Sequence, residues 1–448
     1  MNIALCHFRV GETDGVSLEM KKWKRALAML GHNVYYLAGS TGTSDGYIIP
    51  ELHYQDAQNN KLVKNAYQEL TDYNDQDELK QALLNTAGKI EKGLNKFIKE
   101  YGIELLILNN IWSLGWGIPA AIAFIRVSQE LGVKCIAHHH DFYWERKYYR
   151  QPTGPVIKEI LQNYFPPDDE LITHVVINSI AQAELKRRKG LNSIVIPNVF
   201  DFKQPLWKID QYNQDLKVSL GIGAADLVIL QATRVAERKA IELAIEVVGQ
   251  LEERRLELNG FLYDGRIFTE ESQIILLIPG LLEAESKYID FLKRLAEQRG
   301  VKICWANSLI KDCRLESTEK KYYSLWDAYA IADLITYPSM LEGWGNQLLE
   351  GLFAKKPMVI FEYPVYQSDI KEKGFSCISL GDTYHSQQNG YVQLSAEKIT
   401  EAATQSIYYL KEFKQREQMV ERNFLLGEKY FSEQVLQNLL EDLLNKSS

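Results

Sequence analysis

The stretch Glu342-Gly-Trp-Gly-Asn-Gln-Leu-Leu-Glu350 follows an apolar run at 332–338 that ends in proline, and these two segments together indicate the fold. The apolar run is typical of a short parallel strand, so the glycines lie at the carboxyl end of a strand, where open α/β sheets bind ligands. The glycines let backbone N–H groups approach a ligand, and these groups are unpaired at the start of a helix. Glu342 and Glu350 are too far apart to share one metal ion, so we expect them to accept hydrogen bonds from different hydroxyls of an elongated ligand. The alternative is a solvated pair of helix acids.

A second strand-to-helix segment lies upstream, at 227–251, and its turn carries Arg234 and Lys239. A helix N-terminus offers free N–H groups and partial positive charge, while a guanidinium binds phosphate oxygens in pairs and an ammonium adds a point charge. We therefore predict a phosphate site at this turn. The alternative is a solvated basic turn that Glu237 and Glu242 balance. Because the turn is polar, replacing either cation is expected to leave the fold intact.

Strands and helices alternate along the 448-residue chain, with apolar runs at 104–108, 133–137, 173–177 and 193–196 before the pattern restarts at 227. This alternation predicts an α/β protein with two parallel sheets, and the length suits two domains. The amino-terminal segment supports the same interpretation. It has a strand over 1–8, a glycine-containing loop that ends at Gly15, and a helix over 17–30 that Asp14 or Ser17 caps.

The apolar run at 133–137 ends in three histidines, His138, His139 and His140, followed by Asp141. Side chains alternate along a strand, so at most two of the histidines share a face, and no second His or Cys cluster supplies further ligands. We therefore expect no metal site here, and we expect His138 to have a structural role.

Composition describes a globular protein, with 46% hydrophobic and 25% charged residues. The formal charge of −8 argues against general nucleic-acid binding. Five scattered cysteines without a Cys-x-x-Cys pair, and a first strand that starts at Asn2, indicate reduced thiols, no signal peptide and a cytoplasmic location.

Together these motifs resemble the retaining family-4 glycosyltransferases of the GT-B fold. Arg234 and Lys239 match the family's Arg-x4-Lys pattern, and Glu342 and Glu350 match its Glu-x7-Glu pattern. The segment Ile-Pro-Asn-Val-Phe-Asp at 196–201 is similar to the family's interdomain Ile-Pro-Asn-Gly-Val-Asp, and Lys355-Lys-Pro357 is similar to its Gly-x-Pro. Two family glycines are thus replaced, one of them by Lys355. These replacements put the local backbone conformation in question, but they do not affect the match of Glu342 and Glu350.

The resemblance implies two Rossmann-like domains whose parallel sheets face each other across an interdomain cleft. Residues 1–200 are expected to form an acceptor-side domain, with an insertion over 39–80 and a helix over about 425–448 that crosses back onto it. Residues 201–424 are expected to bind the donor. The implied reaction is a metal-independent, retaining transfer of a hexose from a nucleoside diphosphate sugar to an acceptor hydroxyl, without a cofactor. A GT-B phosphorylase, a nucleotide-sugar epimerase and a catalytically silent sugar-nucleotide-binding protein are the alternatives.

The resemblance also assigns roles to residues. Arg234 and Lys239 stabilise the leaving phosphate in place of a metal ion, Glu342 contacts the donor sugar, and Glu350 contacts the ribose. His140 lies beside the anomeric centre and the primary hydroxyl of the donor sugar. The implied catalytic residues are His140, Arg234, Lys239 and Glu342. The implied donor-binding residues are Gly15, Asp141, Arg234, Lys239, Gly343, Trp344, Gly345, Asn346 and Glu350.

Basic residues gather on the expected acceptor side. Those expected to hold a carboxylate or phosphate of a small acceptor are Arg9, Arg146, Lys147 and Arg150. The run Lys21-Lys-Trp-Lys-Arg25 has the composition of a membrane-contacting helix in family members that act on lipids. We interpret it instead as a solvated helix face, so that a lipid acceptor and peripheral membrane contact are the alternative. Which nucleotide base, donor sugar and acceptor are used cannot be derived from these motifs.

Overall fold

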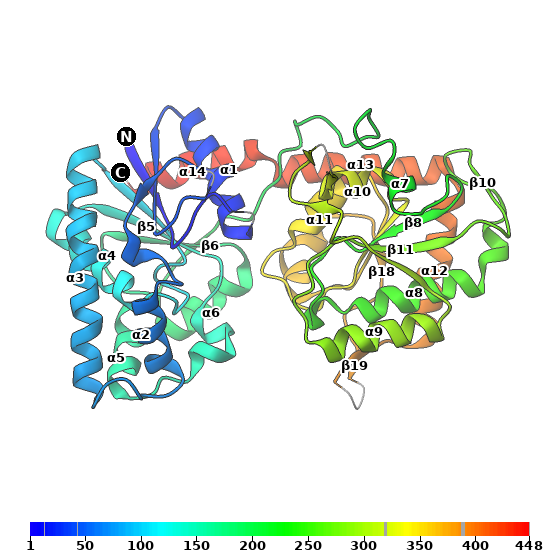
Figure 1. The fold of residues 1–448 in the computed structure, drawn as a ribbon. Helices are drawn as coiled ribbons and strands as arrows, with labels where there is room; N and C mark the ends of the chain where they lie inside the picture. The colour runs from blue at the N-terminus through cyan, green and yellow to red at the C-terminus, as the bar shows by residue number, and fades with distance from the viewer. Residues whose placement is uncertain (13, 43, 318–319, 387–389, 448) are drawn as a thin grey trace. The chain divides into compact units, whose positions relative to one another are not determined.

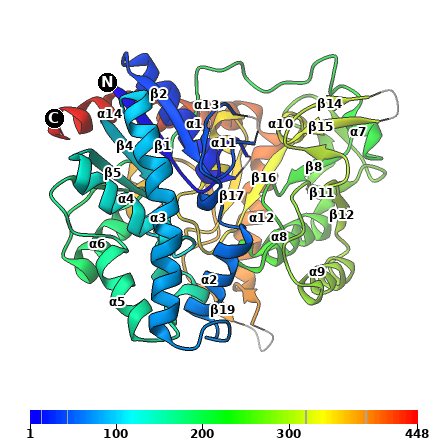
Figure 2. The ribbon, with the colours of Figure 1, turned by 60° about the vertical axis from the view of Figure 1, so that its left-hand side comes forward.

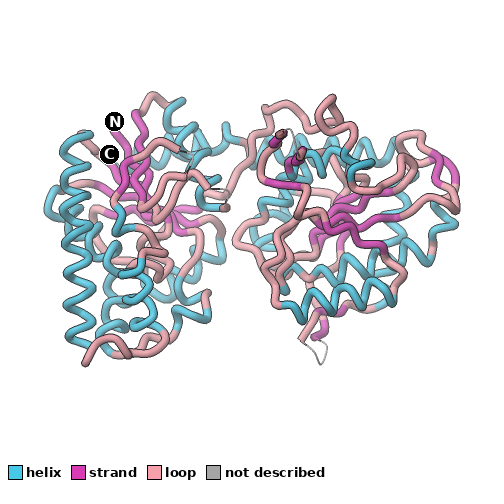
Figure 3. Tube along the Cα trace, in the orientation of Figure 1, coloured by secondary structure: helices cyan, strands magenta, loops and turns pink. Residues whose placement is uncertain are grey.

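The computed structural model describes residues 1–447 except residues 13, 43, 318–319 and 387–389. The chain divides into two compact units. The first unit comprises Met1–Val199 and Glu433–Ser448, and the second comprises Phe200–Ser432. Figure 3 shows that in each unit the strands of a central sheet lie between layers of helices.

The first unit contains, within the described residues, a sheet of seven parallel strands in the order β3-β2-β1-β4-β5-β6-β7. The strand order reverses between β1 and β4, which makes this point the topological switch of the sheet. The strands are β1 (Asn2–Cys6), β2 (Asn33–Ala38), β3 (Tyr47–Ile48), β4 (Leu105–Asn109), β5 (Lys134–His139), β6 (Ile172–Val176) and β7 (Ile194–Val195).

Both faces of this sheet are buried, which explains why its strands are apolar throughout rather than alternating. Ala4 and Cys6 of β1 pack into a core under α2 (Ala57–Tyr67), α3 (Gln76–Tyr101), α4 (Ile118–Leu131) and α5 (Pro155–Tyr164). Ile3 and Leu5 point to the opposite face, which α1 (Gly15–Met29) and α14 (Glu433–Ser447) cover. Figures 1 and 2 show α3 running along its face of the sheet and α14 lying beside α1. A further helix, α6 (Ser179–Lys189), packs beside β6 and β7.

Local capping explains two features of the first unit. Asp14 accepts hydrogen bonds from the backbone N–H groups of Val16 and Ser17, so it caps α1 as predicted. Residues 39–80, predicted as an insertion without clear periodicity, contain β3, α2 and the start of α3. Asp56 and Asp75 cap these two helices through their side chains.

The second unit contains, among the described residues, a six-stranded parallel sheet in the order β12-β11-β8-β16-β17-β18. Its order reverses between β8 and β16. The strands are β8 (Leu227–Leu230), β11 (Ile274–Ile278), β12 (Lys302–Trp305), β16 (Leu334–Tyr337), β17 (Met358–Ile360) and β18 (Ile378–Ser379).

Two groups of helices cover this second sheet (Figure 1). One face carries α8 (Ile241–Glu253), α9 (Ser286–Gln298) and α12 (Ala396–Lys411), and the other carries α10 (Leu325–Ile331), α11 (Asn346–Phe353) and α13 (Phe413–Phe431). A small sheet of β13 (Ile310–Lys311), β14 (Leu315–Glu316) and β15 (Lys321–Ser324) precedes α10. The predicted α/β class with two parallel sheets is confirmed.

None of the helices in the described part of the chain combines the length and the apolar character that a membrane span needs.

Candidate functional site

The predicted site residues gather at the topological switch of each sheet. In the second unit they follow β8 and β16, and in the first unit they follow β1 and β5. The carboxyl ends of parallel strands leave a crevice at such a point, because the connections leave in opposite directions. Each group is described below within its own unit.

Lys239 and Glu342 form a buried ion pair in the second unit. Lys239 ends the 3-10 turn Glu237–Lys239 and is 3% exposed, and its Nζ contacts Glu342 Oε1. Arg238, which the sequence analysis did not single out, places Nη1 3.4 Å from Glu342 Oε2. Burial alone would raise the pKa of Glu342, but the charges of Lys239 and Arg238 hold it below its ordinary value. The alternative of a solvated basic turn therefore does not describe Lys239, because its ammonium is enclosed against a carboxylate.

Arg234 lies in a different environment. Its side chain is 54% exposed, and Nη1 donates to Glu283 Oε1 at 2.7 Å. The structure thus places the two predicted phosphate cations near one strand end, one buried and paired with a site acid, the other exposed and paired with a surface acid. An exposed guanidinium can exchange its partner at little cost, whereas a buried ammonium cannot.

The glycine turn before α11 is tightly built. Gly345 has a φ of 122°, and a Cβ atom at this residue would lie 2.1 Å from the hydroxyl of Tyr363. That hydroxyl donates to the carbonyl oxygen of Trp344 at 2.8 Å. The indole of Trp344 is buried against Phe431, so this residue contributes to the turn through its backbone and not through its ring. A glycine is therefore required at 345, and α11 begins directly after it, at Asn346.

Glu350 lies in the second turn of α11 and is 9% exposed. Its Oε2 accepts a hydrogen bond from the Tyr329 hydroxyl at 2.7 Å. Tyr329 in turn packs against Trp207, whose ring stacks on Trp326 with centroids 4.5 Å apart. The sequence motifs do not include these three aromatic residues, because one lies in a polar boundary segment and two lie on an apolar helix.

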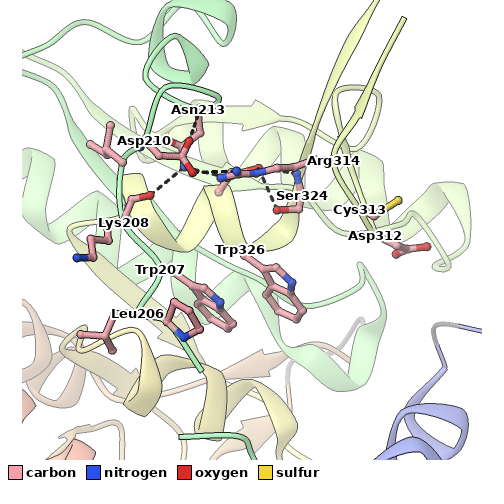
Figure 4. A pocket seen from close by; sticks show the side chains of 13 residues that line it. Leu206, Trp207, Lys208, Asp210, Asn213, Asp312, Cys313, Arg314, Ser324 and Trp326 are labelled. Atoms are coloured by element: carbon pink, nitrogen blue, oxygen red, sulfur yellow. Dashed lines mark hydrogen bonds and ion pairs between the residues drawn. The ribbon is translucent and has the colours of Figure 1, made fainter. Parts of the chain in front are cut away.

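A cavity of about 540 Å³ opens beside the stacked tryptophans (Figure 4). Its polar side is closed by Arg314, which pairs with Asp327 and with Asp210. Figure 4 shows both rings on the apolar side and the Arg314 network across from them. Of the residues that the structure describes, none of those predicted for the site lines this cavity.

The first unit gathers histidines around two asparagines. His140 directly follows β5, and its Nε2 lies 3.1 Å from Oδ1 of Asn109 at the end of β4. The backbone N–H groups of His140 and Asp141 both donate to Oδ1 of Asn110, at 2.8 and 3.3 Å. Asn110 has a φ of 58°, a left-handed conformation that asparagine tolerates better than most residues. The sequence motifs do not include these two asparagines. The signal that could have indicated them is their position at the end of a strand next to the strand that carries the histidines.

The two preceding histidines of the run, His138 and His139, are buried. The ring of His138 stacks on Trp23 with centroids 4.2 Å apart, as its predicted structural role implies. His139 and His174 lie 3.0 Å apart through Nε2 and Nδ1. Within the described residues, no three His, Cys, Asp or Glu side chains are arranged to hold a metal ion.

The predicted acceptor residues divide into paired and unpaired cations. Arg9 donates to Tyr54 at 2.7 Å and lies 3.0 Å from Glu12, and Arg146 lies 2.9 Å from Asp141. Lys147 and Arg150 are exposed on the 3-10 turn Lys147–Arg150, and no carboxylate among the described residues pairs with them. Gly15 is the first residue of α1, next to its cap.

The basic run at 21–25 does not present an aromatic face. Trp23 is 2% exposed beneath α1, Lys22 pairs with Glu19, and Arg25 pairs with Glu433. Lys22 and Arg25 are thus paired with neighbours in their own unit, and the aromatic residue that a membrane-contacting helix would expose is part of the core.

Lys355 occupies the position of a glycine in the Gly-x-Pro pattern. Its φ is 52°, so the left-handed turn is retained without the glycine. Its ammonium pairs with Glu421 at 2.5 Å and lies over the ring of Phe424. These contacts offset part of the cost of a side chain in this conformation.

Comparison with known proteins places these motifs in context. The family described as glycosyl transferases group 1 matches residues 213–424. The mannosylglucosylglycerate synthase of Petrotoga mobilis is 49% identical over 382 residues, which cover 85% of this chain and 87% of that protein. The enzyme of the same name from Thermotoga maritima is 38% identical over 441 residues, which cover 98% of this chain and 99% of that protein.

Solved structures agree on the fold. A sucrose-phosphate synthase from Thermosynechococcus elongatus has a TM-score of 0.58 at 13% identity and covers 100% of this chain, with 98% of its own chain matched. A glycosyltransferase from Rickettsia africae has a TM-score of 0.60 at 13% identity, with the same coverage. At such identities the likeness concerns the fold alone.

Proposed function

This chain belongs to the retaining family-4 glycosyltransferases of the GT-B fold, and we propose that it transfers a mannosyl group from a nucleoside diphosphate mannose to glucosylglycerate. Hexose transfer from a nucleoside diphosphate sugar follows from the family. The choice of mannose and glucosylglycerate rests on one observation: two relatives that match most of this chain are both mannosylglucosylglycerate synthases. The comparisons favour transfer over the phosphorylase, epimerase and silent binding alternatives.

The leaving group poses the main energetic problem of the reaction. As the bond between the anomeric carbon and the β-phosphate oxygen breaks, negative charge grows on the phosphate, and preorganised cations stabilise that charge more than they stabilise the ground state. In the proposed mechanism Lys239 and Arg234 supply this charge without a metal ion. Arg238 joins them, since it already shares Glu342 with Lys239.

The two acids have separate roles in the proposal. Glu350 accepts hydrogen bonds from the ribose, and the amides of 343–346 hold the donor. Glu342 accepts from the donor sugar while it stays paired with Lys239, since a carboxylate has room for several donors. The acceptor hydroxyl attacks the anomeric carbon from the face that the phosphate leaves, and its proton passes to the departing phosphate. Configuration is thereby retained without a carboxylate nucleophile.

A small anionic acceptor fits the cations of the first unit. Glucosylglycerate carries a carboxylate, and a guanidinium or an ammonium that lacks a carboxylate partner can bind one. Lys147 and Arg150 meet this description, whereas Arg9 and Arg146 already have acidic neighbours. The five free cysteines are consistent with a cytoplasmic site of action, which remains part of the proposal.

An acceptor comparison tests the proposed function. The purified protein would be incubated with GDP-mannose, UDP-mannose or ADP-mannose. Each donor would be offered glucosylglycerate or its neutral analogue, in which the carboxylate is reduced to an alcohol. We expect one base to be preferred and the charged acceptor to react faster, with an α-linked product by NMR if the donor is α-linked. Equal transfer to both acceptors, or a product of inverted configuration, would contradict the proposal.

A further inference from the structure

Asn109 is the last residue of β4 and contacts histidines that follow or end the neighbouring strands. Its side-chain Oδ1 lies 3.0 Å from Nδ1 of His138 and 3.1 Å from Nε2 of His140. Its backbone carbonyl oxygen lies 2.7 Å from Nδ1 of His7. A single asparagine therefore meets three imidazoles at the switch point of the first sheet.

The amide of Asn109 has one favourable orientation. Its Nδ2 lies 3.5 Å from the carbonyl oxygen of Cys6, so the reversed amide would set two acceptor oxygens against each other. Oδ1 therefore faces the histidines, and a carbonyl oxygen can only accept. Consequently Nδ1 of His138 and Nε2 of His140 must each carry a hydrogen. The nitrogen on the other side of the His140 ring is left with a lone pair when the ring is neutral.

The backbone around His140 is fixed by the next residue, Asn110, whose side chain accepts from the N–H groups of both His140 and Asp141. The Ser113 hydroxyl lies 3.2 Å from the same oxygen. These hydrogen bonds fix the backbone at His140, and the contact of Nε2 with Asn109 holds the ring. His140 is only partly buried, and Nδ1 has no hydrogen-bond partner within the described chain.

The surroundings keep His140 neutral. Burial lowers the pKa of His140 to about 3, the charge of His7 adds to the shift, and that of Asp14 opposes it. Burial also lowers the pKa values of His138 and His139 well below their ordinary range. The titratable and charged groups around this cluster are His7, Arg9, Asp14, His138 and His139.

We propose that Asn109 is a positioning residue that holds His140 as the neutral Nε2–H tautomer, so that His140 offers only the Nδ1 lone pair to the substrate. On the proposed function, His140 then accepts a hydrogen bond from a sugar hydroxyl and neither donates a proton nor adds positive charge at the phosphate. The tautomer itself rests on geometry alone and does not depend on that function.

Nitrogen NMR of the unliganded protein tests the tautomer directly. In protein labelled with ¹⁵N-histidine, the His140 signals are assigned by their loss in His140→Gln. We expect a protonated Nε2 and an unprotonated Nδ1 at neutral pH. A protonated Nδ1, alone or with Nε2, would overturn the proposal. Because no substrate is needed, this result stands whether or not the proposed mannosyl transfer is correct.

The Asn109→Asp variant tests the consequence, with Asn85→Asp on the exposed side of α3 as the matched control. A carboxylate at 109 favours the imidazolium and raises the pKa of His140, so the ¹⁵N titration of the variant should show the ring gaining its second proton at a clearly higher pH than in wild type. Below that raised pKa the kcat should fall by about tenfold to hundredfold relative to wild type, the scale of loss when the partner that orients a functional histidine is altered. Activity should recover as the pH rises and the ring loses its proton. An unchanged ¹⁵N titration, or an unchanged kcat and pH profile, would refute the positioning role. Should Asn109→Asp fail to fold, the wild-type spectrum still decides.

Discussion

We expect Lys239→Met to unfold at a clearly lower temperature than wild type, because the substitution leaves Glu342 as a buried carboxylate with a weaker partner. Removing one member of a buried ion pair costs about 3 to 5 kcal/mol. Arg238 still lies 3.4 Å from the carboxylate but is 41% exposed, so we expect the lower end, about 3 kcal/mol. For a unit of this size that corresponds to a fall in Tm of about 6 to 12 °C.

Arg234→Met is the matched control. Arg234 pairs with Glu283 at an exposed position, where an ion pair contributes less than about 1 kcal/mol. Both variants should nevertheless lose about 10² to 10³ in kcat, the scale for one preorganised charge partner of a transition state. The two variants should therefore differ in their stability and not in their activity.

The assay is thermal and urea unfolding, with hydrogen exchange of peptides from β8 and β16 to assign the transition to the second unit. In the double variant Lys239→Met/Glu342→Gln the side chain at 342 carries no charge to leave unpaired, so most of the lost stability should return, and the double-mutant cycle gives the pair energy. The reasoning fails if Lys239→Met costs no more than Arg234→Met, or if adding Glu342→Gln restores nothing.

Three further outcomes are expected. Glu350→Gln should weaken binding of free nucleoside diphosphate more than tenfold by calorimetry, since a charged hydrogen bond contributes about 1.5 to 3 kcal/mol, while Glu342→Gln should leave it near wild type; equal effects would contradict the separate roles. Turnover should persist in excess EDTA because cations supply the charge, and a loss that one divalent ion restores would revive a metal site. Burial lowers the pKa values of His7, His140 and His174 to about 4, 3 and 4. Between about pH 6.5 and 4 the unfolded chain therefore binds more protons than the folded one, and the free energy of unfolding should fall as the pH falls, whereas a flat urea-unfolding profile would speak against buried neutral rings.

The two parallel sheets and the local start of α1 were within reach of the sequence. Apolar runs at regular intervals predicted the parallel strands, and Asp14 predicted the cap, because both depend on residues close together in the chain. The Arg-x4-Lys and Glu-x7-Glu patterns placed Lys239 and Glu342 at two strand ends, and the register of β8 beside β16 brings those ends together.

Other features depend on tertiary contacts that carry no local pattern. Polar neighbours in the sequence predicted a polar turn at Lys239, but the burial of its side chain depends on what packs over the turn. The contact of Asn109 with His140 arises from the pairing of β4 with β5, in which Asn109 lies opposite His138. The burial of Trp23 against His138 likewise joins a helix and a strand that are distant in sequence.

The position of α14 in the first unit has a consequence for synthesis on the ribosome. Its residues Leu436, Leu440 and Leu443 complete the apolar layer against Ile3 and Leu5, yet all of Phe200–Ser432 is translated between them. The second unit is continuous and can close its core as it emerges. The nascent first unit must wait, with one face of its sheet only partly covered by α1, until α14 has left the exit tunnel. Chaperones that bind apolar surface would thus meet the amino-terminal part of this protein for longer than the part made after it.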